Sequence, residues 1–535
     1  MNLLTKAPDI ASSLHVCFTP ASPGSNPRLV RKTFLQTILA VAISILPPMV
    51  AHAGSATWDL NPGSGDWNTA ANWTPATVPN GPADTATFAF SNTTDVSISA
   101  DTEVNGITFT PAATNPYLIT LSEFTFLTLS GTGITNNSGI EHGLELLFST
   151  LQFSNSSTAD NANIRNGPGG GTFFSDTSTA GSATILNFTG LTAFLDSSTA
   201  GSADIFMDDL GITEFSNTST AGSATIFGYG AILFDESSKG GTARIEVFQG
   251  FGLIGFLDIR GHNAPGVTIG SIEGGEDIGL GGGNVFLGAN NLTVGSNNLS
   301  TRFSGVIYDG GFAGSLTKIG TGTLDLMGEN TYTGLTNING GVLQVDGSIL
   351  SNTFINHKGT LAGSGTVNGN VTNYSGNVSP GDPLGVPGAL TISNNYMQTP
   401  SATLAIQIGD ADPGQVSVLT VLGNANLNGS LDPELVNDFV PAIGQSFTFL
   451  EYASVTNSFS HIKNPVFDHG TKRWSLVYGP NSAYLVVVSN GRPKLSMKRS
   501  RDGSSVILKP NQSATRTEME AHQRLDGHLA DFKEP

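Results

Sequence analysis

A repeat of about 20 residues dominates the chain between residues 153 and 250. Each copy carries a Ser-Thr-Ala-Gly-Ser-Ala motif, complete at 178–183, 198–203 and 219–224 and degraded at 157–159 and 238–243. A phenylalanine precedes each motif, and an isoleucine lies six residues after the second position of the motif. The isoleucines are Ile164, Ile185, Ile205, Ile226 and Ile245, and the phenylalanines are Phe153, Phe174, Phe194, Phe215 and Phe234. Both series advance by 21, 20, 21 and 19 residues, which predicts one structural unit that stacks on its copies.

The unit is predicted to be a coil of short strands and not a pair of helices. Segments such as 183–186 and 192–195 are short and β-prone, and Gly, Ser, Asp and Asn separate them. Short strands with turns at equal spacing are typical of a parallel β-solenoid. An antiparallel sandwich or propeller is the alternative, and the equal spacing favours the solenoid. The isoleucines and the phenylalanines would then form two interior ladders.

Four short polar residues lie two positions after successive phenylalanines. They are Asn155, Asp176, Asp196 and Asn217. Asn and Asp tolerate turn conformations and hydrogen-bond the nearby backbone with their side chains. We therefore expect each of them to occupy a turn and to bond its local backbone.

Composition narrows the class of protein. Only 12% of the 535 residues are charged, 66 are glycine and the mean hydropathy is +0.02. Helices need charged residues on their solvent faces and disordered chains lack apolar residues to bury, so neither class fits. The net charge of −19 also disfavours binding to nucleic acid or to an anionic membrane surface.

Residues 1–53 are predicted to be a secretory signal peptide. Arg28, Arg31 and Lys32 precede an apolar run at 34–46, and Ala51-His52-Ala53 suggests cleavage before Gly54. The apolar run is too short to span a bilayer, and we expect no membrane-spanning segment after it. The single cysteine, Cys17, lies in this part, so the mature chain would hold no thiol for catalysis or for metal binding.

Residues 303–346 closely resemble the autotransporter-associated β-strand repeat of bacterial autotransporter passengers and related secreted proteins. The resemblance lies in Phe-Ser-Gly-Val-Ile at 303–307, Leu-Thr-Lys-Ile-Gly-Thr-Gly-Thr-Leu at 316–324, Asn-Thr-Tyr-Thr-Gly at 330–334 and Gly-Gly-Val-Leu at 340–343. Residues 359–367, 378–381 and 444–450 are similar more loosely. The resemblance implies a right-handed parallel β-helix on the outside of a bacterium, with adhesive or structural duty.

The expected organisation has five parts. A tryptophan-rich N-terminal cap at 54–90 follows the signal peptide, and the parallel β-helix occupies 91–436. A C-terminal β cap at 437–490 and a basic, polar, weakly ordered tail at 491–535 complete the chain. The tail is too short for the outer-membrane barrel of an autotransporter, so we expect a passenger-like chain without its own anchor.

A β-helix can also host a polysaccharide lyase or hydrolase, which is the alternative function. Pectin-hydrolysing β-helices use an Asp pair, a Gly-His-Gly and an Arg-Ile-Lys on one face. Asp208-Asp209, Gly261-His262-Asn263 and Arg244-Ile245 are similar, but the second glycine and the lysine are missing and the order is wrong. Asp468-His469 is better explained as a turn before Gly470. The sequence therefore names no catalytic residue.

Two further features suggest ligand binding without catalysis. Glu273, Glu276 and Asp277 lie in a glycine-rich stretch that could hold calcium, although an acidic solvated loop explains them as well. The repeated threonines could bind glycan or ordered water as a regular array, or could be plain corners of the coil. They are Thr158, Thr179, Thr199 and Thr220.

The sequence thus predicts a non-catalytic secreted or cell-surface β-helix protein with an adhesive or structural role. No catalytic, cofactor-binding or metal-binding residue is assigned, and no cofactor is expected. The expected partners are glycans or other surface proteins, at an extracellular or outer-membrane-associated location.

Overall fold

The computed structural model describes residues 54–250, 254–275, 281–412 and 414–491, together with the backbone of two strands at 496–499 and 506–509. The predicted signal peptide at 1–53 lies outside these residues. Within them the regular structure is strand apart from one 3-10 turn, η1 (Ala70–Asn72). The all-β prediction is confirmed.

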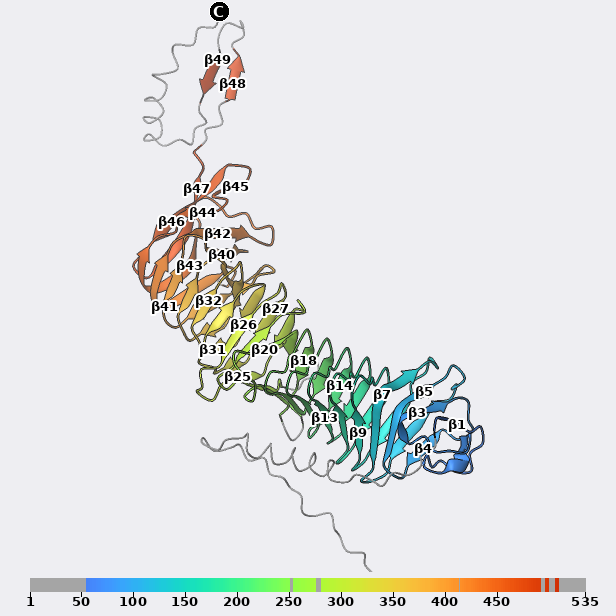
Figure 1. Ribbon diagram of the computed structural model, residues 1–535. Coiled ribbons are helices and arrows are strands. Elements are labelled where there is room, and N and C mark those ends of the chain that lie inside the picture. Colours follow the sequence, from blue (N-terminus) through green and yellow to red (C-terminus); the bar gives the residue numbers. More distant parts are fainter. Residues whose placement is uncertain are drawn as a thin grey trace, which may run out of the picture. The chain divides into compact units, whose positions relative to one another are not determined.

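Strands of successive coils lie side by side in parallel sheets, as Figure 1 shows for β9 to β18. Sheet I contains, in order, β2 (Trp73–Thr74), β1 (Ala56–Trp58), β3 (Gly81–Phe88), β5 (Thr102–Phe109), β7 (Phe126–Asn136), β9 (Thr150–Phe153), β11 (Gly171–Phe174), β13 (Leu191–Phe194), β15 (Ile212–Phe215), β17 (Ala231–Phe234), β19 (Phe256–Asp258), β22 (Asn284–Phe286) and β25 (Val306–Tyr308). Sheet II contains β21 (Ser271–Glu273), β18 (Arg244–Val247), β16 (Thr225–Gly228), β14 (Asp204–Met207), β12 (Thr184–Asn187), β10 (Asn163–Asn166), β8 (Gly143–Leu146), β6 (Leu118–Leu121) and β4 (Asp95–Ile98).

Two further sheets continue the coils toward the C-terminus. Sheet III contains β20 (Gly266–Ile269), β23 (Asn291–Val294), β26 (Ser315–Lys318), β29 (Thr336–Ile338), β32 (Thr353–Ile355), β35 (Val371–Asn373), β39 (Tyr396–Gln398), β41 (Val418–Leu427), β38 (Ala389–Ile392), β34 (Thr366–Val367), β31 (Ser348–Ile349) and β28 (Glu329–Asn330), with β43 (Ser446–Asn457), β45 (Val466–Phe467), β46 (Lys472–Tyr478) and β47 (Ser482–Ser489) attached. Sheet IV contains β24 (Thr301–Phe303), β27 (Thr323–Leu326), β30 (Val342–Val345), β33 (Thr360–Gly363), β36 (Asn377–Asp382), β40 (Thr403–Ile408), β42 (Ser430–Leu435) and β44 (His461–Ile462), with β37 (Val386–Pro387) attached. The chain is a parallel β-solenoid, as predicted.

The two predicted interior ladders are present. Ile185 pairs with Ile164 on one side and with Ile205 on the other, and the series continues to Ile226 and Ile245. The five phenylalanines pair in the same manner through β9, β11, β13, β15 and β17. Their ring centroids lie 4.7–4.8 Å apart with interplanar angles of 6–10°, and every ring is fully buried.

The predicted turn residues lie in turns, but they bond a neighbouring coil and not their local backbone. Asn155, Asp176, Asp196 and Asn217 all have φ between 53° and 57°, which Asn and Asp tolerate better than other residues. The backbone N–H of Asn155 donates to Oδ2 of Asp176 at 2.8 Å, and that of Asp176 donates to Oδ2 of Asp196 at 3.1 Å. Stacking places the next coil closer to the side chain than any local donor, so the local interpretation was wrong.

The stacking of coils also explains why the repeated motif contains a glycine. Gly201 has a φ of +61°, and a Cβ there would lie 2.5 Å from the carbonyl oxygen of Gly181 in the preceding coil. Only glycine fits both the left-handed backbone and this approach.

Three tryptophans close the N-terminal end of the solenoid. Trp58, Trp67 and Trp73 are buried, and Trp73 lies 4.9 Å from each of the other two in edge-to-face contact. The antiparallel pairing of β2 with β1 ends sheet I at this side. An uncovered strand edge would otherwise offer free backbone groups to another chain.

The pairing changes from parallel to antiparallel at the C-terminal end. β43 pairs in parallel with β41 on one side and antiparallel with β47 on the other, and β46 follows β47 antiparallel. The last parallel edge is therefore covered by a meander that begins at 446. Beyond it, β48 (Ser496–Arg499) and β49 (Val506–Lys509) pair with each other antiparallel. The domain boundaries and the order of the rest of the tail stay predictions.

Candidate functional site

The residues that resemble the pectin-hydrolase motif do not converge. Asp208 and Asp209 follow the end of β14 in sheet II, whereas His262 follows β19 in sheet I. The ring nitrogens of His262 lie 2.5 Å from the carbonyl oxygen of Asn263 and 2.7 Å from that of Ser238, so its imidazole ties two turns together. Arg244 begins β18, two coils beyond Asp208. The three motifs therefore lie on different sheets or different coils and do not form one site.

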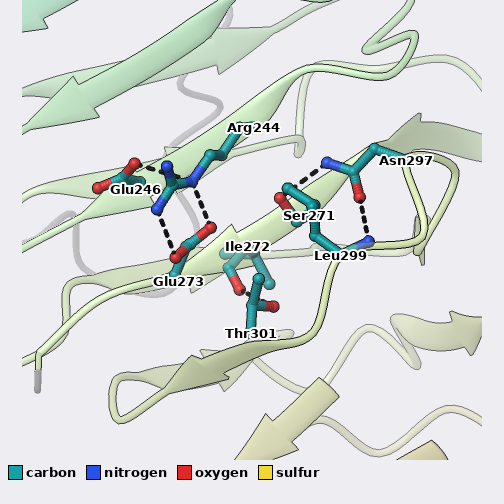
Figure 2. Close-up of polar contacts among 8 residues, drawn as sticks. All are labelled: Arg244, Glu246, Ser271, Ile272, Glu273, Asn297, Leu299 and Thr301. Atoms are coloured by element: carbon teal, nitrogen blue, oxygen red, sulfur yellow. Dashed lines mark hydrogen bonds and ion pairs between the residues drawn. The ribbon is translucent and has the colours of Figure 1, made fainter. Parts of the chain in front are cut away.

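Arg244 is instead the centre of an ion-pair cluster on the outer face of sheet II (Figure 2). Glu246 and Glu273 are side by side in the register of β18 and β21, where like charges would repel. The guanidinium Nε donates to Oε1 of Glu273 at 2.6 Å and Nη2 donates to Oε2 at 2.9 Å, while Glu246 lies 3.0 Å from Nε. Arg244 thus offsets the repulsion between the stacked glutamates.

This cluster bears on the calcium hypothesis. Both carboxylate oxygens of Glu273 accept hydrogen bonds from Arg244, so calcium would have to displace a bidentate guanidinium. The other two residues of the hypothesis, Glu276 and Asp277, lie outside the described residues. Among the residues that the structure does describe, no three His, Cys, Asp or Glu side chains gather in a metal-binding group.

Asp468 and His469 form a turn, as predicted. Both have positive φ, and Gly470 donates its backbone N–H to the carbonyl oxygen of Phe467 at 3.1 Å between β45 and β46. The Lys472 ammonium, 3.1 Å from Asp468, lowers the pKa of that carboxyl. The His469 side chain is 98% exposed, and its Nδ1 lies 3.5 Å from Oδ1 of the neighbouring Asp468.

A buried Ser–His contact escaped the sequence reasoning. Oγ of Ser138 lies 2.8 Å from Nε2 of His142, whose ring stacks on Phe109 with centroids 3.8 Å apart. The backbone N–H of Tyr117 donates to Nδ1 of His142, so Nε2 carries the proton of the neutral ring. Burial lowers the pKa of His142 to about 4. The imidazole therefore donates to the serine and cannot act as its base.

A second Ser–His contact lies at the opposite end of the chain. Oγ of Ser430 lies 2.7 Å from Nε2 of the exposed His461. The carboxylate nearest in sequence, Asp432, is paired with Lys463 at 3.1 Å. This contact therefore lacks the acid that orients the imidazole in a hydrolase triad.

The repeated threonines lie at half-buried corners of the coil. They bridge one another in parallel from Thr158 through Thr179 and Thr199 to Thr220. Each hydroxyl accepts the backbone N–H two residues later, for example that of Gly201 to Thr199 Oγ1 at 3.0 Å. The hydroxyls thus stabilise their own turns, and binding of glycan or water to this row stays a prediction.

Sequence reasoning also missed a row of aromatic side chains on the outer face near β14 and β16. Phe206 lies 5.4 Å from Phe227 and 6.4 Å from Tyr229, and Phe188 lies 6.3 Å away on the other side. These aromatic residues lie next to the buried isoleucines in sequence. Because side chains of a strand alternate between its two faces, their outward position could have been predicted.

A shallow groove of about 360 Å³ crosses the outer face of three coils, and we call it the asparagine groove. Its lining comprises Asn352, Phe354, Asn370, Val371, Thr372, Asn395 and Met397. Phe354, Thr372 and Met397 are in register on β32, β35 and β39 and form its floor. The asparagines precede these three strands and form one wall. An asparagine just before each strand is the signal that sequence reasoning overlooked.

These features define a class of protein: a parallel β-solenoid with a buried interior and a covered N-terminal end. The family model described as Passenger-associated-transport-repeat matches residues 316–345. The predicted resemblance to autotransporter passenger repeats is confirmed.

Two curated relatives share short segments with this chain. The extracellular serine protease of Serratia marcescens is 51% identical over 72 residues, which are 14% of this chain and 7% of that protein. The adhesin BmaC autotransporter of Brucella suis biovar 1 is 34% identical over 139 residues, or 25% of this chain and 4% of the adhesin. The chain thus matches less than a tenth of each relative's length.

Among solved structures, the Haemophilus influenzae Hap adhesin is similar at 11% identity and a TM-score of 0.17, over 75% of this chain and 64% of that one. No helix in the described part of the chain is long and apolar enough to cross a membrane.

Proposed function

We propose that this chain is a secreted or cell-surface bacterial β-solenoid with an adhesive or structural role and without catalytic activity. The observation that carries the proposal is the passenger repeat at 316–345, built into a stack of coils with a fully buried interior. A stack of this kind is stable without disulfides and presents a long repeated surface. Many weak contacts along such a surface give strong attachment through multivalency.

The geometry of the candidate residues supports the non-catalytic part of the proposal. His142 has the wrong tautomer to activate Ser138, Asp432 is engaged by Lys463, and Asp208 lies apart from His262. The predicted signal peptide supports export, with glycans or surface proteins as the partners.

The test uses the full chain expressed in a bacterial host. We expect the protein in the medium or on the cell surface, with an N-terminus at Gly54 by Edman sequencing. Beads that carry the purified protein should attach to cells or to polysaccharide surfaces, while casein and polysaccharides incubated with it should stay intact. Release of peptides or reducing sugars, or failure of the beads to attach to any surface together with a cytoplasmic location, would contradict the proposal.

A further inference from the structure

The asparagine groove has a lining without charge. None of its seven residues is Asp, Glu, Lys, Arg or His. Ion pairs therefore contribute nothing to binding there, and the net charge of −19 repels anionic ligands from the protein as a whole. A ligand of the groove must bind through neutral hydrogen bonds and apolar contact.

The wall of the groove fixes the orientation of its amides. The backbone N–H of Asn370 donates to Oδ1 of Asn352 at 2.8 Å, that of Asn395 donates to Oδ1 of Asn370 at 3.2 Å, and that of Asn424 donates to Oδ1 of Asn395 at 2.9 Å. A backbone N–H can only donate, so each Oδ1 must face the next coil. The other branch of each side-chain amide is then the NH2 group.

The amide nitrogens keep hydrogens that the wall does not use. Nδ2 of Asn370 donates to Oδ1 of Asn352 at 3.1 Å, and Nδ2 of Asn395 donates to Oδ1 of Asn370 at 3.2 Å. Each NH2 group has two hydrogens, and the wall takes one. Asn352 and Asn395 are exposed. The wall therefore offers a row of N–H donors that repeats at the coil spacing of about 4.8 Å.

The floor supplies the complementary apolar contact. Phe354 is half-buried, its ring lies 5.7 Å from that of the exposed Tyr374, and Met397 is 36% exposed. Thr372 lies between Phe354 and Met397 and contributes a hydroxyl. An aromatic and a thioether packed in a row present a surface for C–H groups, beside donors for oxygen atoms.

We propose that the asparagine groove binds a neutral polysaccharide, with one sugar residue per coil along the stacking direction. The C–H faces of the sugars pack on Phe354 and Met397, and their hydroxyl oxygens accept from the amides of the wall. The wall amides repeat once per coil, so successive sugars of an extended chain can each meet one amide. This proposal rests on the adhesive function and names its ligand class.

Affinity electrophoresis of the full chain in gels that contain a neutral β-glucan, a xylan or a mannan tests the proposal, with anionic alginate in parallel. We expect at least one neutral polysaccharide to retard the protein and alginate not to retard it. Phe354→Ala removes the stacking surface and Thr372→Arg fills the floor, and each should weaken binding about tenfold. Phe206→Ala, a half-exposed aromatic of sheet II, is the matched control and should bind as the parent does.

Two results would contradict the proposal. If no neutral polysaccharide retards the parent, or if Thr372→Arg binds as tightly as the parent, the proposal is wrong. Thr372 is a surface position, so this variant decides the matter even if Phe354→Ala does not fold. Beads that carry Thr372→Arg separate the two proposals: unchanged attachment to polysaccharide-coated surfaces overturns the groove and leaves the adhesive function standing.

Discussion

The coils at 150–247 and the coils at 315–398 reach the same fold with different interiors. The first set stacks phenylalanine on phenylalanine and isoleucine on isoleucine at intervals of 19–21 residues. The second set stacks Leu324 on Leu343 and Leu361, without aromatic ladders, and buries Lys318, Tyr332 and Tyr396 among them. The first set keeps a nearly constant coil length, whereas successive wall asparagines of the second set are separated by 18 and then 25 residues.

The strongest test of this comparison removes one ring of the phenylalanine ladder. Phe194 is fully buried between Phe174 and Phe215, at 4.8 Å from each. Phe194→Ala leaves a cavity that rigid neighbours cannot fill, and should lower the free energy of unfolding by about 3–5 kcal/mol. Urea denaturation followed by circular dichroism measures the loss. Phe206→Ala is the control, and a loss of equal size there would show that stacking in the ladder adds nothing.

The buried lysine distinguishes the second set of coils by its response to alkali. Burial lowers the pKa of Lys318 from 10.5 to about 8, so the unfolded chain binds its proton more tightly than the folded chain does. Stability should therefore rise by about 3 kcal/mol between pH 8 and pH 10.5. Lys318→Met should lack this rise. Parallel slopes of parent and variant over that range would contradict the assignment.

The coil just before the phenylalanine ladder should lose stability in acid, because His142, like Lys318, holds its proton less tightly in the folded chain. Burial lowers the pKa of His142 from 6.5 to about 4, so its contribution to stability is complete above pH 6.5 and is lost as the pH falls to 4. The expected loss is about 3 kcal/mol, measured by urea denaturation at each pH. His142→Gln should remove this part of the pH dependence. If the variant keeps the full acid sensitivity of the parent, other groups cause it.

The smallest expected loss of stability comes from a substitution in the turns that follow the phenylalanine strands. Asn217 has a φ of 57°, and its Oδ1 accepts the backbone N–H of Asp196. Asn217→Val should cost about 1–2 kcal/mol because a β-branched residue resists this conformation. Asn217→Gly tolerates the conformation and should lose only the side-chain hydrogen bonds, which Oδ1 accepts from Asp196 and Nδ2 donates to Glu236. Thermal unfolding of the two variants ranks them, and equal melting temperatures would mean that backbone strain is not the cause.

The regular half of the fold could be predicted from sequence because its period is nearly constant. Ile185 and Phe194 recur with their partners at 20–21 residues, so their pairing follows from counting. The groove could not be found by counting. Asn352, Asn370 and Asn395 are separated by 18 and then 25 residues, because a longer coil intervenes. Only the folded register shows that these asparagines are stacked.

The contact of Ser138 with His142 eluded prediction for a different reason. The two residues lie in an irregular turn after β7, where no strand period applies. The tautomer of His142 depends on the backbone N–H of Tyr117, which is 25 residues distant in sequence. The turn residues recur with the period of the ladders, but the sequence did not show that Asn155 bonds Asp176 of the next coil and not its local backbone.

The matching faces of the phenylalanine coils have a consequence for how this protein changes over generations. Phe174, Phe194 and Phe215 each meet the same side chain above and below. Loss or gain of one whole coil of 20 or 21 residues joins two surfaces that already fit, whereas loss of a few residues shifts every later strand out of register. Unequal recombination between the repeats can therefore shorten or lengthen the molecule in steps of one coil without redesigning either end.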